Sequence, residues 1–330
     1  MQNDTVHQVP PVSKQITTEP THQAMRKPYN SVLAAIGNTP LVALDFASQG
    51  TIYAKLEYLN PGGSLKDRSA LFMIEQAEQA GLLKPGGTII DASSGNQGIA
   101  TAMIGAIKGY KVIITVSEKI SKEKMDAIRS YGAQIIVCPA IEKIEDPQHY
   151  HSQAVALHKS MPNSYMPNQY FSTLNAQAHY KLLGPEIWQQ THGMITHFIA
   201  GAGTCGTVSG AGRYLKEQNP NIKVIALDAE TSYRATGGNP KPYKVEGIGI
   251  DWDTPMLDLN VIDEVLPVSD ANAFAMLKTL AHKYGILAGP SSGAVAWAGS
   301  EYAKQLKPTD IAVMMFGDSG RAYLSKNLYI

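Results

Sequence analysis

Short apolar segments rich in β-branched residues alternate with segments of helical pattern from about residue 85 to near the end of this chain. Parallel neighbouring strands need a long crossover, which a helix supplies, and near-continuous apolar strands are buried on both faces. The alternation therefore predicts an α/β fold with parallel sheets flanked by helices. We expect strands at 88–91, 111–116, 134–138, 197–200, 223–227 and 311–316, and helices at 96–106, 122–131, 208–218 and 270–284.

Composition limits the classes to which the chain can belong. Its 330 residues can bury a large core, which predicts two lobes. A formal net charge of +0 with 17% charged residues speaks against a surface for nucleic acid or membranes. Cys138 and Cys205 suggest neither a disulfide framework nor a metal site, and we see no transmembrane run or signal-type segment. We expect a cytoplasmic protein with small-molecule partners and no metal.

Lys66 lies where an extended segment gives way to a helical one. Pro-Gly-Gly at 61–63 makes a turn, and Ser64 with Asp67 has the spacing of a capping box. Lys66 is therefore expected in the first turn of a helix, where desolvation would lower its pKa and favour the neutral amine that forms Schiff bases. A lone lysine at a helix start usually faces solvent, so the motifs that follow decide its role.

Three glycine- and serine-rich motifs accompany this lysine. The sequences SSGNQGIA at 93–100, GAGTCGT at 201–207 and GPSSGA at 289–294 follow in order. With NPGGSLKDR at 60–68, they have the order and spacing of fold type II pyridoxal-phosphate (PLP) enzymes. From residue 36 almost to its end, the chain resembles the cysteine synthase / cystathionine β-synthase family. Stretches similar to the cystathionine β-synthase branch lie at 118–124, 168–170, 246–249 and 318–321.

The resemblance implies a two-lobed α/β fold like that of the tryptophan synthase β subunit. It places a large PLP-binding lobe at 29–60 and 173–330, and a smaller mobile lobe with the substrate-binding loop at 61–172. Residues 1–28 are polar and aperiodic, which indicates a flexible tail or an arm packed on another surface. The family is commonly homodimeric, so a homodimer is expected.

The glycine-rich segment at 201–206 also fits a different cofactor. It reads G-x-G-x-x-G between an expected strand and an expected helix, and Asp228 ends the next strand. Taken alone, this is the fingerprint of an NAD-binding dehydrogenase. Glycine amides at a helix N-terminus bind phosphate in either case. Because a dehydrogenase gives no reason for the motifs at 60–68, 93–98 and 289–293, PLP is favoured and NAD remains the alternative.

The resemblance assigns the cofactor contacts. Lys66 would hold PLP covalently and serve as general base once an amino acid displaces it. Asn96 would hydrogen-bond the 3′-oxygen, and Ser291 would meet the pyridine nitrogen. A hydroxyl cannot hold a pyridinium as aspartate does, so the ring would be a weaker electron sink that suits β-elimination better than transamination. The phosphate-binding residues would be Gly203, Thr204, Cys205, Gly206 and Thr207.

Two residues of these motifs have simpler interpretations. Cys205 stands where the family commonly has glycine, and we interpret it as a small buried side chain that offers its backbone amide to phosphate. A thiol beside a helix N-terminus would have a lowered pKa, so sensitivity to oxidation is the alternative. Ser292 is expected to cap the helix that follows it.

The expected substrate site surrounds Asn96. Ser93, Ser94 and Gln97 open a helix there, and such a loop suits a substrate carboxylate. Gln97 stands where the family usually has threonine, so the pocket is expected to be altered. Gln169 resembles a family glutamine that touches the same carboxylate, and Gly247, in the stretch at 246–249, is assigned to the substrate side.

These assignments predict PLP-dependent β-replacement, in which serine or an O-activated serine exchanges its β-substituent for a thiol, homocysteine or sulfide. Ile250 stands where cystathionine β-synthases typically have tyrosine, which strengthens the alternative of a cysteine synthase that uses O-acetylserine or O-phosphoserine. Serine/threonine dehydratase-type β-elimination is another alternative. An NAD-binding dehydrogenase and a non-catalytic homologue are the alternatives of a different class.

Overall fold

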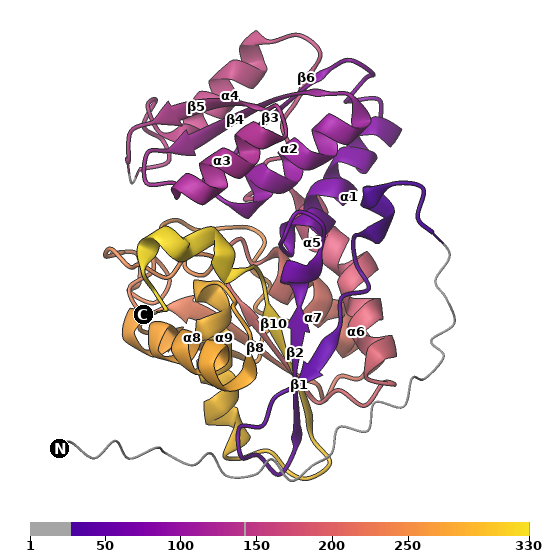
Figure 1. The fold of residues 1–330 in the computed structure, drawn as a ribbon, viewed down its shortest axis with the longest axis vertical. Helices are drawn as coiled ribbons and strands as arrows, with labels where there is room; N and C mark the ends of the chain where they lie inside the picture. The colour runs from indigo at the N-terminus through magenta and orange to yellow at the C-terminus, as the bar shows by residue number, and fades with distance from the viewer. Residues whose placement is uncertain (1–27, 142, 330) are drawn as a thin grey trace, which may run out of the picture.

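The computed structural model describes residues 28–141 and 143–329, so the predicted tail at 1–28 lies almost wholly outside the described residues. Within the described part, the named strands form two sheets, each with its own helices, one above the other in Figure 1. The predicted architecture of parallel sheets flanked by helices is confirmed. No helix in this part of the chain is both long and apolar enough to cross a membrane.

The upper sheet in Figure 1 has four parallel strands in the order β5-β4-β3-β6. Its strands are β3 (Thr88–Ala92), β4 (Lys111–Ser117), β5 (Gln134–Cys138) and β6 (Ser164–Tyr165), and its helices are α1 (Lys66–Gln79), α2 (Asn96–Lys108), α3 (Lys122–Ser130) and α4 (Tyr150–Ser160). Side chains alternate between the two faces of a strand. Val112 and Ile114 of β4 therefore pack with α2 and α3, whereas Ile113 packs with α4.

The lower sheet has six strands in the order β1-β2-β10-β7-β8-β9, of which β1 alone runs antiparallel to its neighbour. Its strands are β1 (Leu41–Ala43), β2 (Thr51–Leu56), β7 (His197–Gly201), β8 (Lys223–Ala229), β9 (Glu264–Val268) and β10 (Ile311–Phe316). Phe198 and Val313 face α6 (Gly184–Gln190) and α7 (Gly206–Gln218). Ile199 and Met314 face α8 (Asp270–Tyr284) and α9 (Pro290–Ala303).

Shorter helical segments join these layers. They are η1 (Val32–Ala35), η2 (Glu57–Leu59), α5 (Thr173–Ala178), the π-helical η3 (His179–Leu183) and the 3₁₀-helical η4 (Gly320–Lys326). η4, yellow in Figure 1, lies between the two sheets and contacts α3 above it. Ser121 Oγ donates to the carbonyl of Ala322 at 3.0 Å, and Glu123 accepts from the amide of Ser325 at 2.7 Å.

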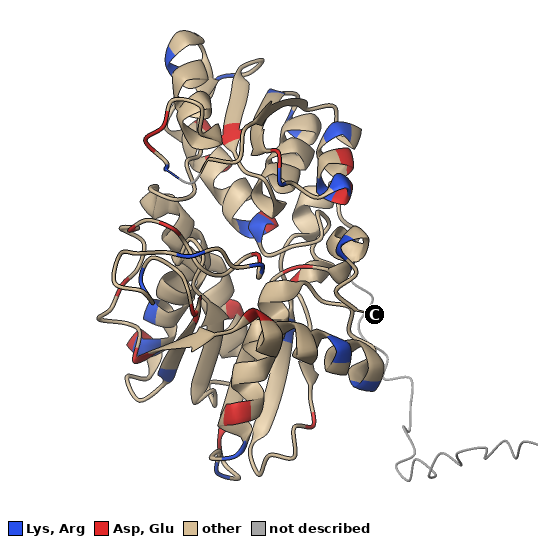
Figure 2. Ribbon diagram, turned by 90° about the vertical axis from the view of Figure 1, so that its left-hand side faces the viewer, with Lys and Arg blue, Asp and Glu red and all other residues tan. Residues whose placement is uncertain are grey.

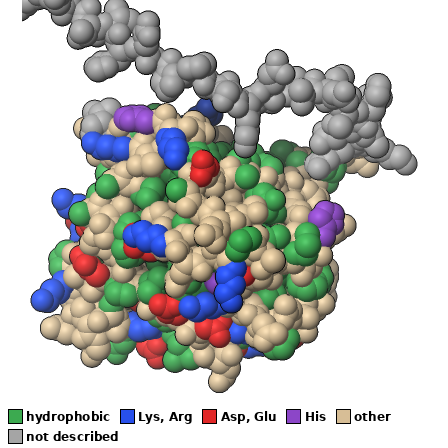
Figure 3. All heavy atoms as spheres, turned by 90° about the horizontal axis from the view of Figure 1, so that it is seen from below, with side chains coloured by type: hydrophobic (Ala, Val, Ile, Leu, Met, Phe, Trp, Pro, Cys, Tyr) green, Lys and Arg blue, Asp and Glu red, His purple; other side chains and the backbone are tan. Residues whose placement is uncertain are grey.

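Charged residues of both signs are spread over both parts of the molecule (Figure 2). The face seen from below likewise carries acidic and basic groups side by side among apolar ones (Figure 3). Several form exposed pairs, such as Lys122 with Asp126 and Lys216 with Asp263. This even mixture agrees with the formal net charge of +0.

Candidate active site

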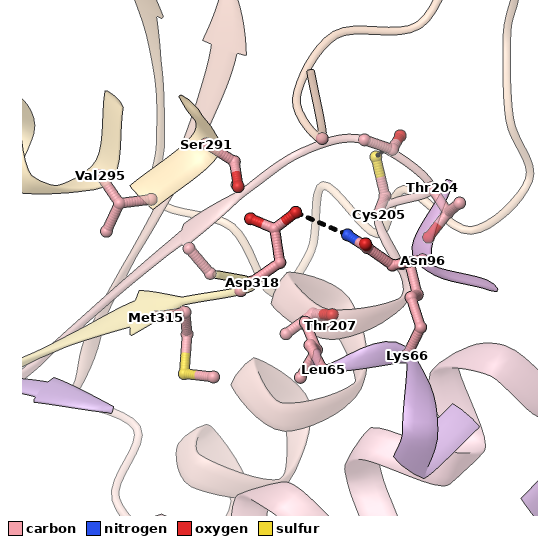
Figure 4. A pocket seen from close by; sticks show the side chains of 15 residues that line it. Leu65, Lys66, Asn96, Thr204, Cys205, Thr207, Ser291, Val295, Met315 and Asp318 are labelled. Carbon is pink, nitrogen blue, oxygen red and sulfur yellow. Dashed lines mark hydrogen bonds between the residues drawn. The ribbon is translucent and has the colours of Figure 1, made fainter. Parts of the chain in front are cut away.

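A cavity opens where the two sheets meet, at the carboxyl ends of β7 and β10 (Figure 4). Ligands bind at this end of the strands in open α/β sheets. The cavity is lined by Leu65, Lys66, Asn96, Ala200, Gly201, Gly203, Thr204, Cys205, Thr207, Gly247, Ser291, Val295, Met315, Gly317 and Asp318. Every residue expected to bind the cofactor lines this cavity except Gly206, whose neighbours Cys205 and Thr207 both line it. The structure thus brings together the four motifs that the sequence assigned to the cofactor, with Gly247 and the segment at 315–318 beside them.

Lys66 is the first residue of α1, as the sequence predicts. Ser64 Oγ accepts from the amide of Lys66 at 3.2 Å. The predicted capping box is nevertheless wrong, because the carboxylate of Asp67 accepts from the amide of Gly62, at 2.5 Å, and Leu65 is the residue before the helix. The turn from Asn60 to Gly63 places the Gly62 amide in reach of Asp67.

The amine of Lys66 is withdrawn from water by the surrounding protein, although the residue as a whole is only partly buried. Desolvation lowers its pKa to about 8, while the negative charge of Asp318 opposes that shift. The predicted direction is therefore confirmed. At neutral pH such a lysine offers much more neutral amine than an exposed one.

A buried ion network fixes the helix that carries this lysine. Arg68 donates from Nε and Nη2 to the two carboxylate oxygens of Glu57, at 2.7 and 2.8 Å. It also donates from Nη1 to Glu186 at 2.8 Å. Arg68 is 2% exposed and Glu57 is fully buried. Removing either residue would therefore leave the other as an unpaired buried charge, which would destabilise the fold. Because Glu57 belongs to η2 and Glu186 to α6, the start of α1 is anchored to the lower sheet and its helices.

Asn96 begins α2 and its amide points at Asp318 (Figure 4). Asn96 Nδ2 donates to Asp318 Oδ2 at 2.7 Å, and Tyr323 donates its hydroxyl to the same oxygen at 2.5 Å. Burial raises the pKa of Asp318. Asp318 is a residue of the cavity to which none of the sequence motifs gives a role. Its position two residues after the end of the central parallel strand β10 is the signal that could have identified it.

Ser291, in the first turn of α9, points toward the same space as Asp318 (Figure 4). Gly247 lies opposite, with a φ of +92°, and a Cβ there would come within 3.1 Å of Ser291 Oγ. A side chain at 247 would therefore crowd Ser291. The prediction that Ser292 caps this helix is wrong. The helix already begins at Pro290, and the Ser292 hydroxyl is buried without a hydrogen-bond partner in the described structure.

The glycine-rich loop lies at the N-terminus of α7. Cys205 precedes the helix in a left-handed conformation, with a φ of +63°, which is the conformation that glycine adopts without strain. A Cβ on Gly203 would lie 2.8 Å from the carbonyl oxygen of Gly247, so the two loops are in close contact. The predicted lowering of the Cys205 thiol pKa is wrong. The side chain is 1% exposed, and burial raises its pKa to about 11 despite the nearby Arg234.

The expected substrate residues are mostly occupied with other protein groups. Ser93 Oγ accepts from the amide of Gly95 at 3.3 Å, and Ser94 Oγ accepts from the amide of Ser117 at 2.5 Å. Gln169 is buried, and its Oε1 has no partner in the described part of the chain. Of the five residues assigned to the substrate, Gly247 lines the cavity. Their roles stay predictions.

Gln97 is turned into the interior of the upper sheet's helices. It is 1% exposed, and its amide lies 3.5 Å from the hydroxyls of Ser69 and Thr101. Thr101 donates to Asp91 Oδ2 at 2.7 Å. Burial raises the pKa of the Asp91 carboxyl to about 6, and hydrogen bonds from Thr101 and Gln97 oppose the shift. Gln97 thus belongs to a buried polar cluster in this structure.

The cavity has the groups that PLP requires. Lys66 supplies an amine with a lowered pKa, and Ser291 supplies a neutral hydroxyl from the opposite side. The N-terminus of α7, with its glycines and two threonines, suits a phosphate. Among the residues that the structure describes, no group of three His, Cys, Asp or Glu side chains is placed to hold a metal ion.

Comparison with known proteins agrees with this geometry. The family model described as "Pyridoxal-phosphate dependent enzyme" matches residues 32–318, and the chain belongs to this family of PLP-dependent enzymes. The G-x-G-x-x-G segment is therefore part of a PLP enzyme, and the family assignment does not favour NAD.

Named relatives carry both of the family's names, cystathionine beta-synthase and cysteine synthase. The chain is 43% identical over 304 residues to a cystathionine beta-synthase of Apis mellifera, with 89% of this chain and 60% of that protein covered. It therefore spans well under two thirds of that relative's length. It is 40% identical over 300 residues to a probable cysteine synthase of Bacillus subtilis (strain 168), covering 89% of this chain and 96% of that protein.

A solved structure extends the likeness to three dimensions. The O-acetylserine dependent cystathionine beta-synthase from Helicobacter pylori superimposes with a TM-score of 0.85 at 37% identity. The match covers 92% of this chain and 100% of that chain. The fold type II architecture inferred from the four motifs is thereby confirmed.

Proposed function

We propose that this protein catalyses PLP-dependent β-replacement, in which serine or an O-activated serine exchanges its β-substituent for a thiol, homocysteine or sulfide. The convergence of Lys66, Asn96, Ser291 and the glycine-rich loop on one cavity supports the proposal. PLP, when bound, supplies the electron sink that makes loss of the β-substituent possible. Lys66, with its lowered pKa, is suited to hold the cofactor and to move the substrate's Cα proton.

The test combines absorbance with product analysis. Purified protein should be coloured by bound PLP, and its spectrum should change on adding serine, O-acetylserine or O-phosphoserine. With homocysteine or sulfide present, a thioether or cysteine should form, and Lys66→Ala should abolish turnover. Colourless protein that gains no colour from added PLP would rule out the proposal. Pyruvate as the main product, with or without thiol, would instead favour the dehydratase-type alternative.

Donor choice is the second part of the proposal. The relatives' names and the apolar Ile250 together favour an O-activated serine over serine itself, as in a cysteine synthase or an O-acetylserine dependent enzyme. Ile250 has an aliphatic side chain, so it cannot supply the phenolic hydrogen bond that a tyrosine would. Comparing kcat/KM for serine and O-acetylserine decides between the two donors.

The substrate loop and the lobes complete the proposal. We infer that Ser93, Ser94, Gln97 and Gln169 reach the substrate carboxylate only when the smaller lobe, residues 61–172, closes on the large lobe of residues 29–60 and 173–330. Replacing Gln97 by Thr should leave PLP bound and change donor affinity; unchanged kinetics for every donor would make Gln97 purely structural. A homodimer and a cytoplasmic location stay predictions, and light scattering tests the first.

A further inference from the structure

One helical segment supports both threonines of the glycine-rich loop from behind. α5 and the π-helical turn η3 that follows it pack against α7. They carry Asn175 and His179, whose side chains contact Thr204 and Thr207 respectively. Residues four positions apart lie on one face of a helix. Asn175 is 1% exposed and His179 is fully buried, so the contacts are made away from solvent.

The orientation of the Asn175 amide follows from its partners. Asn175 Nδ2 lies 2.8 Å from the carbonyl oxygen of Gln169 and 3.0 Å from Thr204 Oγ1. A backbone carbonyl can only accept, so the amide nitrogen must be the atom that faces it. The same NH₂ group then donates to Thr204. Since Thr204 Oγ1 accepts this bond, its own hydrogen remains for an acceptor elsewhere.

The state of His179 follows from burial. Its Nε2 lies 3.3 Å from Thr207 Oγ1, and its Nδ1 has no partner among residues 28–141 and 143–329. Desolvation, together with the charges of Lys66 and Arg68, lowers the pKa of the imidazole well below its usual range, so the ring is neutral. A proton on Nδ1 would make it a buried donor without an acceptor, and orphaned buried N–H donors are rarer in proteins than unsatisfied acceptors. The proton therefore belongs on Nε2, which donates to Thr207.

The hydroxyl oxygens of Thr204 and Thr207 thus accept hydrogen bonds from Asn175 and His179, on the side of α5 and η3. Each hydroxyl has one hydrogen, and each borders the cavity. A phosphate group at physiological pH offers mainly acceptors, so it needs donors. Lys66 is the only cationic side chain among the described residues that line the cavity, and it is assigned to the other end of the cofactor. Neutral donors must therefore carry most of the phosphate binding.

We propose that Asn175 and His179 are positioning residues that turn the hydroxyls of Thr204 and Thr207 into donors toward the cofactor phosphate. Each hydroxyl accepts from the helical segment behind it and donates into the cavity in front. The inference rests on the proposed function, because it requires PLP in this cavity. It adds two residues to the site that touch neither substrate nor cofactor.

The experiment measures the equilibrium dissociation constants of PLP and of pyridoxal, which lacks the phosphate, for the apo protein and its variants. Asn175→Ala and His179→Leu should each weaken PLP binding by about tenfold or more, the size expected for one hydrogen bond to a charged group. Pyridoxal binding should change by less than about twofold, since no phosphate is present to be held. His179→Gln, whose amide can donate to Thr207, should restore much of the PLP affinity.

A spectroscopic readout and a control complete the design. The ³¹P chemical shift of bound PLP should move in Asn175→Ala and His179→Leu and return toward the wild-type value in His179→Gln. His158→Leu removes a 2.8 Å histidine–hydroxyl contact with Ser164 in the other lobe and should change neither readout. If His179→Leu does not fold, Asn175→Ala supplies the same comparison.

Two outcomes separate this inference from the function on which it rests. Equal losses of PLP and pyridoxal affinity would indicate a general structural role for Asn175 and His179 and would overturn the inference. Wild-type protein that binds no PLP would overturn the proposed function itself.

Discussion

Asn96 and Asp318, 222 residues apart in the chain, are joined by a 2.7 Å hydrogen bond at the centre of the cavity. Asn96 opens a helix of the upper sheet, and Asp318 follows the central strand of the lower one. The bond therefore links the two halves of the molecule at the point where the cofactor would bind. Tyr323 donates to the same oxygen and holds the carboxylate in place.

The hydrogen bond between Asn96 and Asp318 should give the two residues a measurable coupling energy in the free energy of unfolding. In a double-mutant cycle on the apo protein, Asn96→Ala and Asp318→Ala should show a coupling of about 1–3 kcal/mol in the free energy of unfolding, since the acceptor is a buried carboxyl group. Urea unfolding of the wild type, both single variants and the double variant gives this value. Additive effects, within about 0.5 kcal/mol, would show that the contact contributes nothing in solution.

The lowered pKa of Lys66 predicts how PLP capture depends on pH. The neutral amine is the reactive form, so the rate at which apo protein takes up PLP should rise with pH and level off above about 8. The negative charge of Asp318 raises the Lys66 pKa, so Asp318→Asn should move the midpoint to lower pH. Stopped-flow absorbance measures the rate. A midpoint near the ordinary lysine value of 10.5 would contradict the burial of this amine.

Asp91 predicts a pH-dependent change in stability. Its pKa is raised from 3.8 to about 6, so the folded protein binds this proton more tightly than the unfolded chain does. That stabilisation is complete below the unfolded pKa and is lost as pH rises through about 6. Relative to Asp91→Asn, the wild type should lose about 2 kcal/mol between pH ~4 and ~7. Urea unfolding at both pH values tests this, with the surface variant Asp126→Asn expected to show no comparable trend.

The ion pair between Lys124 and Glu246 should contribute to the free energy of unfolding. Its side chain is 2% exposed and its Nζ lies 2.7 Å from Glu246, which also pairs with Lys326. Lys124→Met should lower the free energy of unfolding by about 2 kcal/mol, because Glu246 loses its buried partner but keeps the second one. The matched variant Lys122→Met, two residues away and 82% exposed, should change it by less than about 0.5 kcal/mol. Equal effects would mean that the Lys124 pair is no stronger than a surface pair.

Elements with a clear pattern and clear ends could be predicted from the sequence. β5, α8 and β10 begin and end where the apolar periodicity does. β9 was not expected, because Pro267 lies inside this edge strand and prolines argue against a strand. β6 is too short, at two residues, to show any pattern. Such elements form only because the neighbouring strand supplies their hydrogen bonds.

The sequence predicts the site residues whose backbone position a motif fixes. It does not predict the direction of a side chain that is set by burial. Lys66, Asn96 and Ser291 each occupy the first turn of a helix, and the motifs give those turns directly. The direction of the Gln97 side chain depends on Asp91, six residues earlier on a strand, and no local pattern contains that contact. The interpretation of Cys205 as a small buried side chain is confirmed, since it is 1% exposed. The alternative, a thiol pKa lowered by the helix N-terminus, is wrong because burial raises that pKa.

The position of β10 between β2 and β7 has a consequence for how the chain is made. The strands of the upper sheet all come from one continuous stretch of the chain. Each strand that emerges from the ribosome can therefore pair with a strand that emerged before it. The lower sheet lacks one of its central strands until Ile311–Phe316 has emerged, because β10 is the last strand in chain order among the described residues. Until β10 is present, the β1–β2 pair cannot join β7 and the rest of the lower sheet. The edge of β2 that will pair with β10 then stays without hydrogen-bond partners. Newly made protein should therefore depend on protection from aggregation until β10 has left the ribosome.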